Sequence, residues 1–395
     1  MAAEWKETKL IDFMDFNPVL SIKKNSKAKK VPMEMLLPFT RKINGYEVTE
    51  YKGGSKFQNG DTLLARITPC LENGKTAFVS ILEEGETAFG STEFIVLRAK
   101  KNVSDPFFIY YLMRSPFIRE IAIKSMIGSS GRQRVQQDVL ENLEICLPPL
   151  EAQQKIAKIL SSLDEKIELN NKINENLHAQ AQAIFKSWFV DFEPFGGTMP
   201  SDWEEKKVCD VFDITIGKTP PRKELCWFSH KESDIRWLSI SDMKNNDCYA
   251  LTSSEYLTKE AIKKFNIKVV SDNTVLLSFK LTIGRVSIAC GEMATNEAIA
   301  HFNTDDKELV EYLYCYLKNY NYQSLGNTSS IATAVNSKII KTIPFILPTR
   351  EVIEDFHSII VPYFGKIKNN ILENIKLAQI RYMLLPKLMS GELEV

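Results

Sequence analysis

Residues 151–188 read EAQQKIAKILSSLDEKIELNNKINENLHAQAQAIFKSW, a long run without a glycine or proline. Pro148 and Pro149 stand directly before it, where the start of a helix tolerates proline. Because the steps along its best apolar seam alternate between four and three and so average 3.5, the coiled-coil period, the stretch predicts a long helix that pairs with another helix. The seam consists of Ile156, Leu160, Leu163, Ile167, Asn170, Asn174, Leu177, Ala181, Ile184 and Trp188.

A second seam lies 200 residues further along the chain. Both seams contain asparagines at matching steps, Asn170 and Asn174 in the first and Asn370 and Asn374 in the second, and buried amides of this kind fix register at a cost in stability. A single seam would suit an amphipathic surface helix, but two matching seams favour mutual pairing. Pro362 lies inside the second helix and is expected to kink or interrupt it. The second seam reads Phe356, Ile360, Tyr363, Ile367, Asn370, Asn374, Leu377, Arg381, Leu384 and Leu388.

The segments that precede the two helices also repeat. Blocks of similar sequence recur in the same order, with an offset between 198 and 212 residues, as expected for duplicated units that differ in their loops. Several blocks read as a strand, a turn and another strand, and one as a helix. The matched pairs are 5–12 with 203–210, 62–65 with 274–277, 74–79 with 284–289, 91–96 with 295–300, 107–113 with 312–318, and 144–148 with 344–348.

Connectivity favours antiparallel pairing, because the first helix leads into the second unit and the second helix follows it. The expected fold is therefore α+β: two tandem mixed α/β units, each followed by a long helix, with the helices paired as an antiparallel coiled-coil spacer. About 38 residues at 1.5 Å each would make this spacer roughly 55 Å long. The two units would then be related by pseudo-twofold symmetry, which suits a reader of two half-sites.

Composition excludes several classes of protein. The chain has 395 residues, of which 44% are hydrophobic, enough for two or three domains with cores. Fifty basic residues balance fifty acidic ones, so any attraction to nucleic acid must come from the distribution of charge. Seven cysteines without a Cys-x-x-Cys pair suit a reducing cytoplasm and offer neither a disulfide framework nor a zinc knuckle. No leader or apolar stretch of spanning length is evident, so we expect a cytoplasmic protein.

Motifs of catalysis are missing. Asn17-Pro18 lacks the second proline and the aromatic residue of a DNA methyltransferase motif. Gly74–Thr76 and Gly217–Thr219 resemble the ends of phosphate loops, but Pro69 and Phe212 occupy the position of the first glycine. The four histidines are scattered, without metal-ligand spacing. We therefore expect no catalytic residue, no metal and no cofactor on this chain.

Polar and basic loops remain as candidates for binding. Five lysines fall between Lys23 and Lys30, a pattern that a solvated loop would also explain. The stretch Ile127–Arg134 combines glycines, which allow close approach of the backbone, with side chains that can form forked contacts to phosphate or base edges. Its counterpart, Leu325–Ser330, keeps the glycine and the short polar groups but lacks the arginines. Such a difference is expected if the two units read different half-sequences.

Each candidate taken alone could be an ordinary surface charge, but together they supply groups for positioning on phosphates and for reading bases. The candidates are Lys23, Lys24, Lys27, Arg41, Lys42, Arg66, Lys75, Ser129, Arg132, Gln133, Arg134, Lys218, Thr219, Arg222, Lys223, Lys280, Thr282, Arg285, Asn327 and Ser329.

Four blocks resemble those of the specificity subunit of type I restriction-modification enzymes: Gly90–Leu97, Leu147–Ile156, Gln182–Asp191 and Leu384–Glu392. The resemblance covers essentially the whole chain. It implies target recognition domains at 1–148 and 193–348, a central helical region at 149–192, and a C-terminal helical region at 349–395. It also implies two modification subunits that carry S-adenosylmethionine, and restriction subunits that use ATP and Mg²⁺.

The expected function is recognition of a bipartite DNA target, with one domain per half-site and the helices setting the distance between the half-sites. The partner subunits would dock on the outer helix faces and act on an adenine that is flipped from the stack. Two other classes stay open at this point. One is a self-sufficient methyltransferase or nuclease, and the other is a coiled-coil tether that binds proteins without sequence-selective DNA recognition.

Overall fold

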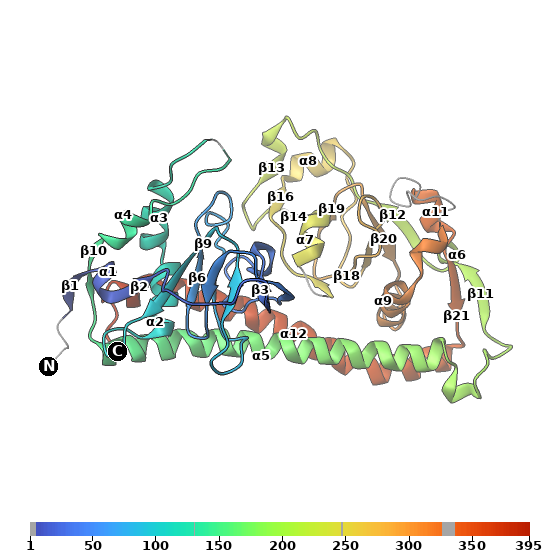
Figure 1. Cartoon of the computed structure of the whole chain (residues 1–395). Coiled ribbons are helices and arrows are strands. Elements are labelled where there is room, and N and C mark those ends of the chain that lie inside the picture. The colour runs from blue at the N-terminus through green and yellow to red at the C-terminus, as the bar shows by residue number, and fades with distance from the viewer. Residues whose placement is uncertain (1–4, 130, 246–247, 326–335) are drawn as a thin grey trace. The chain divides into compact units, whose positions relative to one another are not determined.

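The computed structural model describes residues 5–129, 131–245, 248–325 and 336–395 (Figure 1). The chain divides into two compact units. Unit 1 comprises Met1–Leu169 and Glu373–Val395, and unit 2 comprises Asn170–Leu372. The division falls within the two longest helices, α5 (Leu150–Phe189) and α12 (Arg350–Met389), so each helix contributes to both units.

Unit 1 contains two four-stranded sheets, with strand orders β2-β9-β6-β7 and β4-β3-β8-β5, and an antiparallel ribbon of β1 and β10. The apolar runs of the sequence form the inner strands, since all four residues of β6 are buried. The strands are β1 (Lys6–Lys9), β2 (Met14–Phe16), β3 (Lys27–Val31), β4 (Glu47–Glu50), β5 (Ser55–Phe57), β6 (Thr62–Ala65), β7 (Thr76–Phe78), β8 (Ala88–Gly90), β9 (Phe94–Ala99) and β10 (Glu144–Leu147). The short helices are α1 (Leu10–Phe13), η1 (Met33–Met35), α2 (Pro106–Arg114), α3 (Pro116–Lys124) and α4 (Gln137–Glu141).

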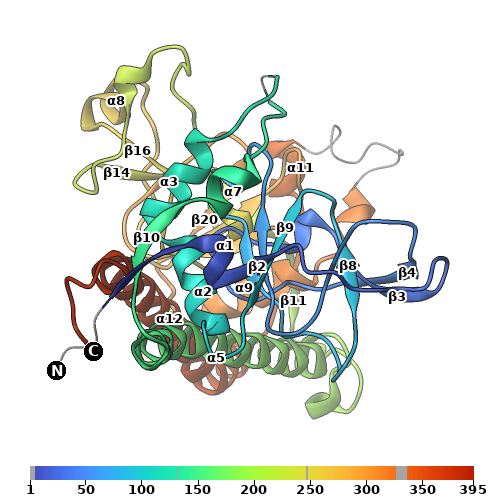
Figure 2. The same cartoon turned by 60° about the vertical axis from the view of Figure 1, so that its left-hand side comes forward.

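Helix α2 joins the sheet of unit 1 to the long helices. Asp105 caps its first turn by accepting a hydrogen bond from the backbone N–H of Phe108 at 2.9 Å, and Pro106 takes the first helical position. The buried side chains of α2 share one core with Leu160 of α5 and Leu388 of α12. Figure 2 shows α2 between the sheet and α5.

Unit 2 contains a five-stranded sheet of order β12-β20-β17-β18-β15, a four-stranded sheet of order β13-β16-β14-β19, and a ribbon of β11 and β21. The strands are β11 (Glu204–Lys207), β12 (Asp213–Ile216), β13 (Phe228–Ser229), β14 (Ile235–Leu238), β15 (Tyr249–Ala250), β16 (Glu255–Leu257), β17 (Val275–Ser278), β18 (Val286–Ala289), β19 (Ala294–Thr295), β20 (Ile299–Asn303) and β21 (Pro344–Leu347). The short helices are η2 (Glu193–Phe195), α6 (Val208–Val211), η3 (Leu225–Trp227), α7 (Ile240–Asn245), α8 (Lys259–Lys264), α9 (Leu309–Asn319), η4 (Tyr322–Leu325) and α11 (Ser337–Lys341).

The two units share one succession of elements. The ribbon of unit 1 pairs Lys6 with Leu147, and that of unit 2 pairs Glu204 with Leu347, each over four residues. Strands β2, β9, β6 and β7 correspond to β12, β20, β17 and β18, and the helices α2 and α4 correspond to α9 and α11. The duplication predicted from the sequence is therefore present in the topology of each unit.

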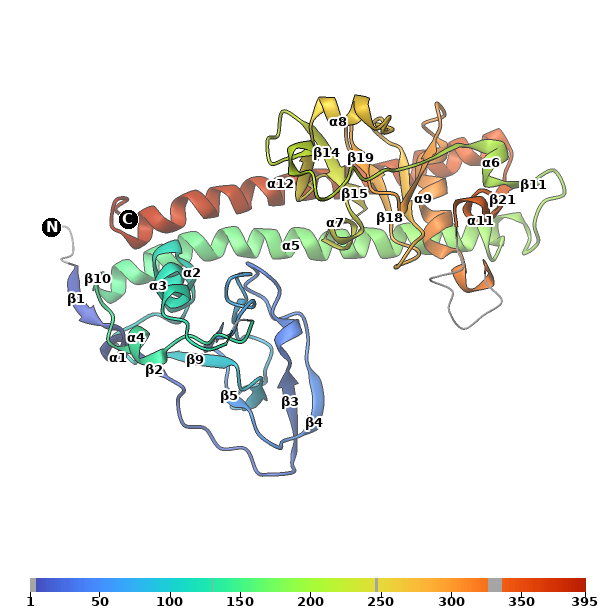
Figure 3. The same cartoon turned by 90° about the horizontal axis from the view of Figure 1, so that it is seen from above.

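Portions of α5 and α12 lie against each other within each unit. In unit 2, Asn370 Nδ2 donates to Asn174 Oδ1 at 2.8 Å, and the ring centroids of Phe185 and Phe356 lie 6.2 Å apart. Because the partner number falls as the number along α5 rises, these portions run antiparallel (Figure 3). In unit 1, Asp164 of α5 pairs with Arg381 of α12. Three of the four seam asparagines are buried, and the fourth is half-buried; these are Asn170, Asn174, Asn370 and Asn374.

Of the two effects expected of Pro362, the interruption is wrong, because α12 continues from Arg350 to Met389, and the kink stays a prediction. Proline removes one backbone donor, which leaves the carbonyl of Ser358 without its helical partner. Both Pro362 and Ser358 are exposed, so water can satisfy that carbonyl. The buried side chains of Ile360 and Phe364 hold the helix on either side of the proline.

Candidate nucleic-acid interface

The loop Ile127–Arg134 closes on itself at one edge of unit 1. The N–H of Arg134 donates to the carbonyl of Ile127 at 2.9 Å, and the N–H of Ile127 donates back at 3.0 Å. Gly128 has a φ of +132°, and a Cβ there would lie 3.0 Å from the carbonyl oxygen of Arg132, so this position requires glycine. Ser129 and Arg132 are exposed, and the Arg132 side chain pairs with none of the residues that the structure describes. The exposed guanidinium of Arg132 thus lies close in the chain to the backbone pair of Ile127 and Arg134.

A bidentate ion pair ties the other arginine of this loop to Glu93. Arg134 Nη2 donates to Glu93 Oε1 at 2.6 Å, and Arg134 Nε donates to Glu93 Oε2 at 2.9 Å. This hydrogen bonding lowers the pKa of Glu93. Arg66 belongs to the same cluster, since its N–H donates to the carbonyl of Glu93 at 2.9 Å and its Nη2 donates to the carbonyl of Val135 at 3.4 Å. The structure therefore brings Arg66 and Arg134, which were predicted separately, together at Glu93, one on its backbone carbonyl and the other on its carboxylate.

A cavity of about 340 Å³ adjoins this cluster, with Arg66 and Thr92 in its wall. Asn17 reaches it from the start of the chain and is fixed on both sides: its Oδ1 accepts from the N–H of Val96 at 2.9 Å, and its Nδ2 donates to Gln137 at 2.7 Å. The remaining lining residues are Pro18, Val19, Leu20, Gly54, Ser55, Lys56, Phe94 and Val96.

The lysine run divides into paired and unpaired members. Lys29 pairs with Glu86 at 2.8 Å, and Lys30 pairs with Glu47 at 3.3 Å. In contrast, the other three lysines are exposed and make no ion pair within the described part of the chain. These three are the predicted candidates Lys23, Lys24 and Lys27, at the turn before β3 and at its first residue.

Two other predicted residues of unit 1 are engaged inside it. Arg41 is 9% exposed, and its Nε and Nη2 donate to the Glu168 carboxylate at 3.0 and 2.9 Å, which gives the guanidinium a structural role against α5. Lys75 is half-buried, with Nζ donating to the carbonyl of Met33 at 3.0 Å. Lys42 is exposed. Contact of Arg41 with DNA would require this buried pair to break, so Arg41 is not available as a DNA contact.

In unit 2 the first cluster lies after β12. Lys218 Nζ donates to the carbonyl of Phe265 at 2.6 Å, and the hydroxyl of Thr219 donates to Glu297. Arg222 donates to Glu255 at 2.8 Å and lies over two aromatic rings, those of Phe228 and Trp237, at 4.4 and 4.5 Å from their centroids. Lys223 is exposed.

The second cluster of unit 2 lies in the connection between β17 and β18. Lys280 is exposed, and the neighbouring Leu281 is 84% exposed with a φ of +62°. Thr282 is half-buried, while Arg285 Nη1 donates to the carbonyl of Ile240 at 2.6 Å. This connection meets the turn that carries Glu297, because the N–H of Phe279 donates to the carbonyl of Ala298 at 2.9 Å. The predicted Asn327 and Ser329 lie outside the described residues.

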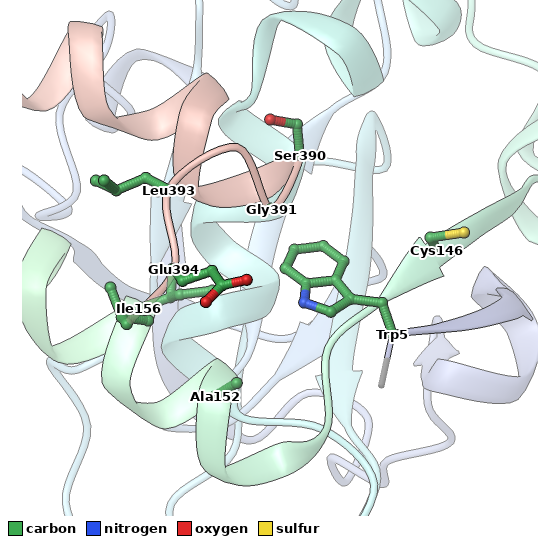
Figure 4. A pocket seen from close by; sticks show the side chains of 9 residues that line it. Trp5, Cys146, Ala152, Ile156, Ser390, Gly391, Leu393 and Glu394 are labelled. Carbon is green, nitrogen blue, oxygen red and sulfur yellow. The ribbon is translucent and has the colours of Figure 1, made fainter. Parts of the chain in front are cut away.

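A further cavity of about 290 Å³ in unit 1 does not suit a phosphate group. Figure 4 shows the indole of Trp5 beside the C-terminal turn at Gly391. The lining residues include the carboxylate of Glu394 but no lysine or arginine. Among residues 5–129, 131–245, 248–325 and 336–395, no cluster of His, Cys, Asp and Glu could hold a metal ion. In the same ranges, every helix is too short or too polar to cross a bilayer.

Comparison with known proteins decides the family. The model of the type I restriction modification DNA specificity domain matches residues 2–179 and 200–380, one match on each copy of the repeat. The chain belongs to this family. It is the specificity subunit of a type I restriction-modification system with two tandem recognition domains, as the resemblance predicted. Specificity subunits recognise DNA, and the catalytic activity lies in their partner subunits.

Relatives of this specificity subunit cover most of its length. The type I restriction enzyme HindI specificity subunit of Haemophilus influenzae is 27% identical over 85% of this chain and 87% of its own. The MjaIX specificity subunit of Methanocaldococcus jannaschii is 29% identical over 73% of this chain and 69% of its own. The crystal structure of a type I system S subunit from M. genitalium has a TM-score of 0.55 at 15% identity, over 98% of this chain and 96% of its own. This last likeness confirms the mixed α/β fold.

Sequence reasoning missed the acidic residues of the specificity subunit's candidate surface. Glu93, Glu255 and Glu297 each bind a predicted basic or hydroxyl side chain. Glu93 stands in a block that repeats, but nothing in the block indicates that its partner is Arg134, 41 residues away.

Proposed function

We propose that this specificity subunit reads a bipartite DNA target, with one half-site for each recognition domain. The observation that carries the proposal is the duplicated topology, in which each copy presents exposed cations beside polar loops. Lys23, Lys24 and Lys27 supply positive charge in unit 1, and Lys223 and Lys280 supply it in unit 2. Contacts of these groups with phosphates would fix position without sequence preference.

Base reading in the first domain falls to the loop that contains Arg132 and Arg134. A guanidinium matches the O6 and N7 acceptors of guanine with two hydrogen bonds. Gln133 lies between the two arginines and is half-buried, and an amide matches adenine in the same bidentate way. The second domain presents different side chains at its clusters, notably Thr219 and Thr282, so the two half-sequences would differ.

The long helices act, in this proposal, as an antiparallel coiled coil that sets the distance between the half-sites. Its support is that both helices enter the core of each unit: Leu160 and Leu385 in unit 1, and Phe185 and Phe356 in unit 2. A helix of 40 residues is about 60 Å long at 1.5 Å per residue. Recognition domains fused to both helices would follow any change in helix length.

Two modification subunits would dock on the outer helix faces, which carry exposed apolar side chains such as Leu169 and Leu372. They would hold S-adenosylmethionine and act on an adenine flipped from the stack, while restriction subunits would use ATP and Mg²⁺. Seven cysteines without a Cys-x-x-Cys pair would suit a complex in the reducing cytoplasm.

Sequencing of modified bases tests the assignment of half-sites. In the assembled complex, the combined substitutions Arg132→Ala and Arg134→Ala should relax the first half-site alone. Each lost bidentate contact removes about 1–3 kcal/mol of discrimination. Lys280→Ala, in the other domain, is the matched control and should leave the first half-site unchanged. Equal losses at both half-sites would show that the arginines supply only charge.

A further inference from the structure

We propose that Glu93 is a specificity-determining residue of the first recognition domain. Its carboxylate holds the reading side chain of Arg134 and releases it to a base edge in preference to a phosphate. This inference rests on the proposed function and assigns to an acidic residue a part in selecting the DNA sequence.

The ion pair occupies the atoms that would read a base. Both Nε and Nη2 of Arg134 donate to Glu93, at distances between 2.6 and 3.0 Å. The Arg134 side chain is 46% exposed and that of Glu93 is 21% exposed, so the guanidinium lies on the solvent side of the carboxylate. A DNA group that binds Arg134 through the same two atoms must therefore replace Glu93.

A second cation, Arg66, lies near enough to act on the Glu93 carboxylate. Arg66 is half-buried, and its Nε is buried without a hydrogen-bond partner among the described residues. The hydrogen bond from Arg134, followed by the charges of Arg134 and Arg66, lowers the pKa of Glu93. When Arg134 turns toward DNA, the charge of Arg66 continues to favour the ionised carboxylate of Glu93. The move of Arg134 from Glu93 to DNA therefore leaves the negative charge of Glu93 at the edge of the interface.

That retained charge discriminates between possible partners of Arg134. A phosphate oxygen is anionic, so placing it beside ionised Glu93 brings two like charges together. A guanine edge offers two acceptors without a net charge, so it replaces the hydrogen bonds with less repulsion. Glu93 thereby weakens binding to an arbitrary duplex more than binding to the correct one, and specificity is this difference in affinity.

Unit 2 contains a comparable pair. Glu297 accepts a hydrogen bond from the hydroxyl of Thr219, a predicted DNA contact. A two-residue turn precedes the inner strand of each domain, β9 in unit 1 and β20 in unit 2. Glu93 is the second residue of the first turn, and Glu297 is the first residue of the second turn. Each domain thus has a glutamate in this turn that binds a candidate reading side chain.

The test is Glu93→Gln in the complex with its modification subunits. Fluorescence anisotropy would compare a duplex that contains the target with a scrambled duplex, over a range of KCl concentrations. We expect the affinity for the scrambled duplex to rise two- to fivefold, which corresponds to the free energy of an exposed ion pair. The affinity for the target duplex should change little. Arg134 would then be free to neutralise one more phosphate of the scrambled duplex, so the slope of log K against log salt should steepen by about one.

Glu120→Gln is the matched control. It removes the same charge from the exposed pair of Glu120 with Lys124, at 2.6 Å in the same unit, and should leave the ratio of affinities unchanged. If Glu93→Gln also leaves the ratio unchanged, or lowers both affinities equally, Glu93 only supports the loop and the inference is overturned. If the unsubstituted complex itself fails to discriminate between the duplexes, the proposed function fails instead.

Discussion

Removal of Asp164 should destabilise unit 1 selectively. The carboxylate of Asp164 is buried on α5, where it accepts a hydrogen bond from the hydroxyl of Tyr111 at 2.6 Å and pairs with Arg381 of α12. Nη1 of Arg114 lies 3.8 Å from Asp164 Oδ2, and Arg114 as a whole is only 8% exposed. Asp164→Ala would leave two largely buried cations without their counter-ion.

The expected loss is large for a single substitution. Breaking a buried ion pair by removing one partner costs about 3–5 kcal/mol, because the other charge stays desolvated. For a domain of about 150–250 residues, each kcal/mol shifts Tm by about 2–4 °C, so a loss of 4 kcal/mol predicts a fall of about 8–16 °C. Replacing both Asp164 and Arg381 by leucine should recover part of the loss, since no unpaired charge would remain at that pair.

Differential scanning calorimetry of the full chain can test this expectation. The transition of unit 1 should move to lower temperature while that of unit 2 stays in place. Glu151→Ala serves as the surface control, because its pair with Lys155 is exposed, and it should cost less than about 1 kcal/mol. A loss within 1 kcal/mol for Asp164→Ala would refute the reasoning about the buried cluster.

Two more predictions concern unit 2. Burial lowers the pKa of His301 to about 4, against about 6.5 in an unfolded chain, so between these values the unfolded state binds the extra proton. The contribution of His301 to the free energy of unfolding is therefore complete above pH 6.5 and falls by about 3 kcal/mol as the pH drops to 4. Urea unfolding at stepped pH should show this fall, and His301→Asn should make the fall smaller. A Cβ at Gly217 would lie 2.0 Å from Thr295 Oγ1, so Gly217→Ala should cost about 1–3 kcal/mol in the same assay. Gly365→Ala meets nothing within 4 Å on α12 and should stabilise by about 0.5–1 kcal/mol; equal effects of the two substitutions would contradict the steric argument.

Periodicity predicted the long helices closely, because burial along a helix follows sequence spacing directly. The expected helix over 151–188 corresponds to α5 (Leu150–Phe189), and the seam residues Leu160 and Leu388 are fully buried. Arg381 interrupts the apolar seam for a reason that spacing cannot reveal. Its partner, Asp164, is 217 residues away and lies on the other helix.

The candidate interface was less predictable, because a basic residue's role depends on where remote carboxylates fall. Arg41 resembles a surface cation in the sequence, yet Glu168, 127 residues away, holds it inside unit 1. Within the lysine run, Glu47 and Glu86 neutralise two members and leave three exposed. Residue type thus identified the loops, while folding decided which cations remain available.

Changing the length of both long helices tests the central claim most directly. Insertion of one heptad into each of α5 and α12 lengthens the proposed spacer by about 10.5 Å, or about three base pairs at 3.4 Å each. Methylated sites would be mapped by sequencing modified bases in cells that carry the altered subunit. The account predicts unchanged half-sequences separated by a spacer about three base pairs longer. Altered half-sequences at an unchanged spacing would contradict it.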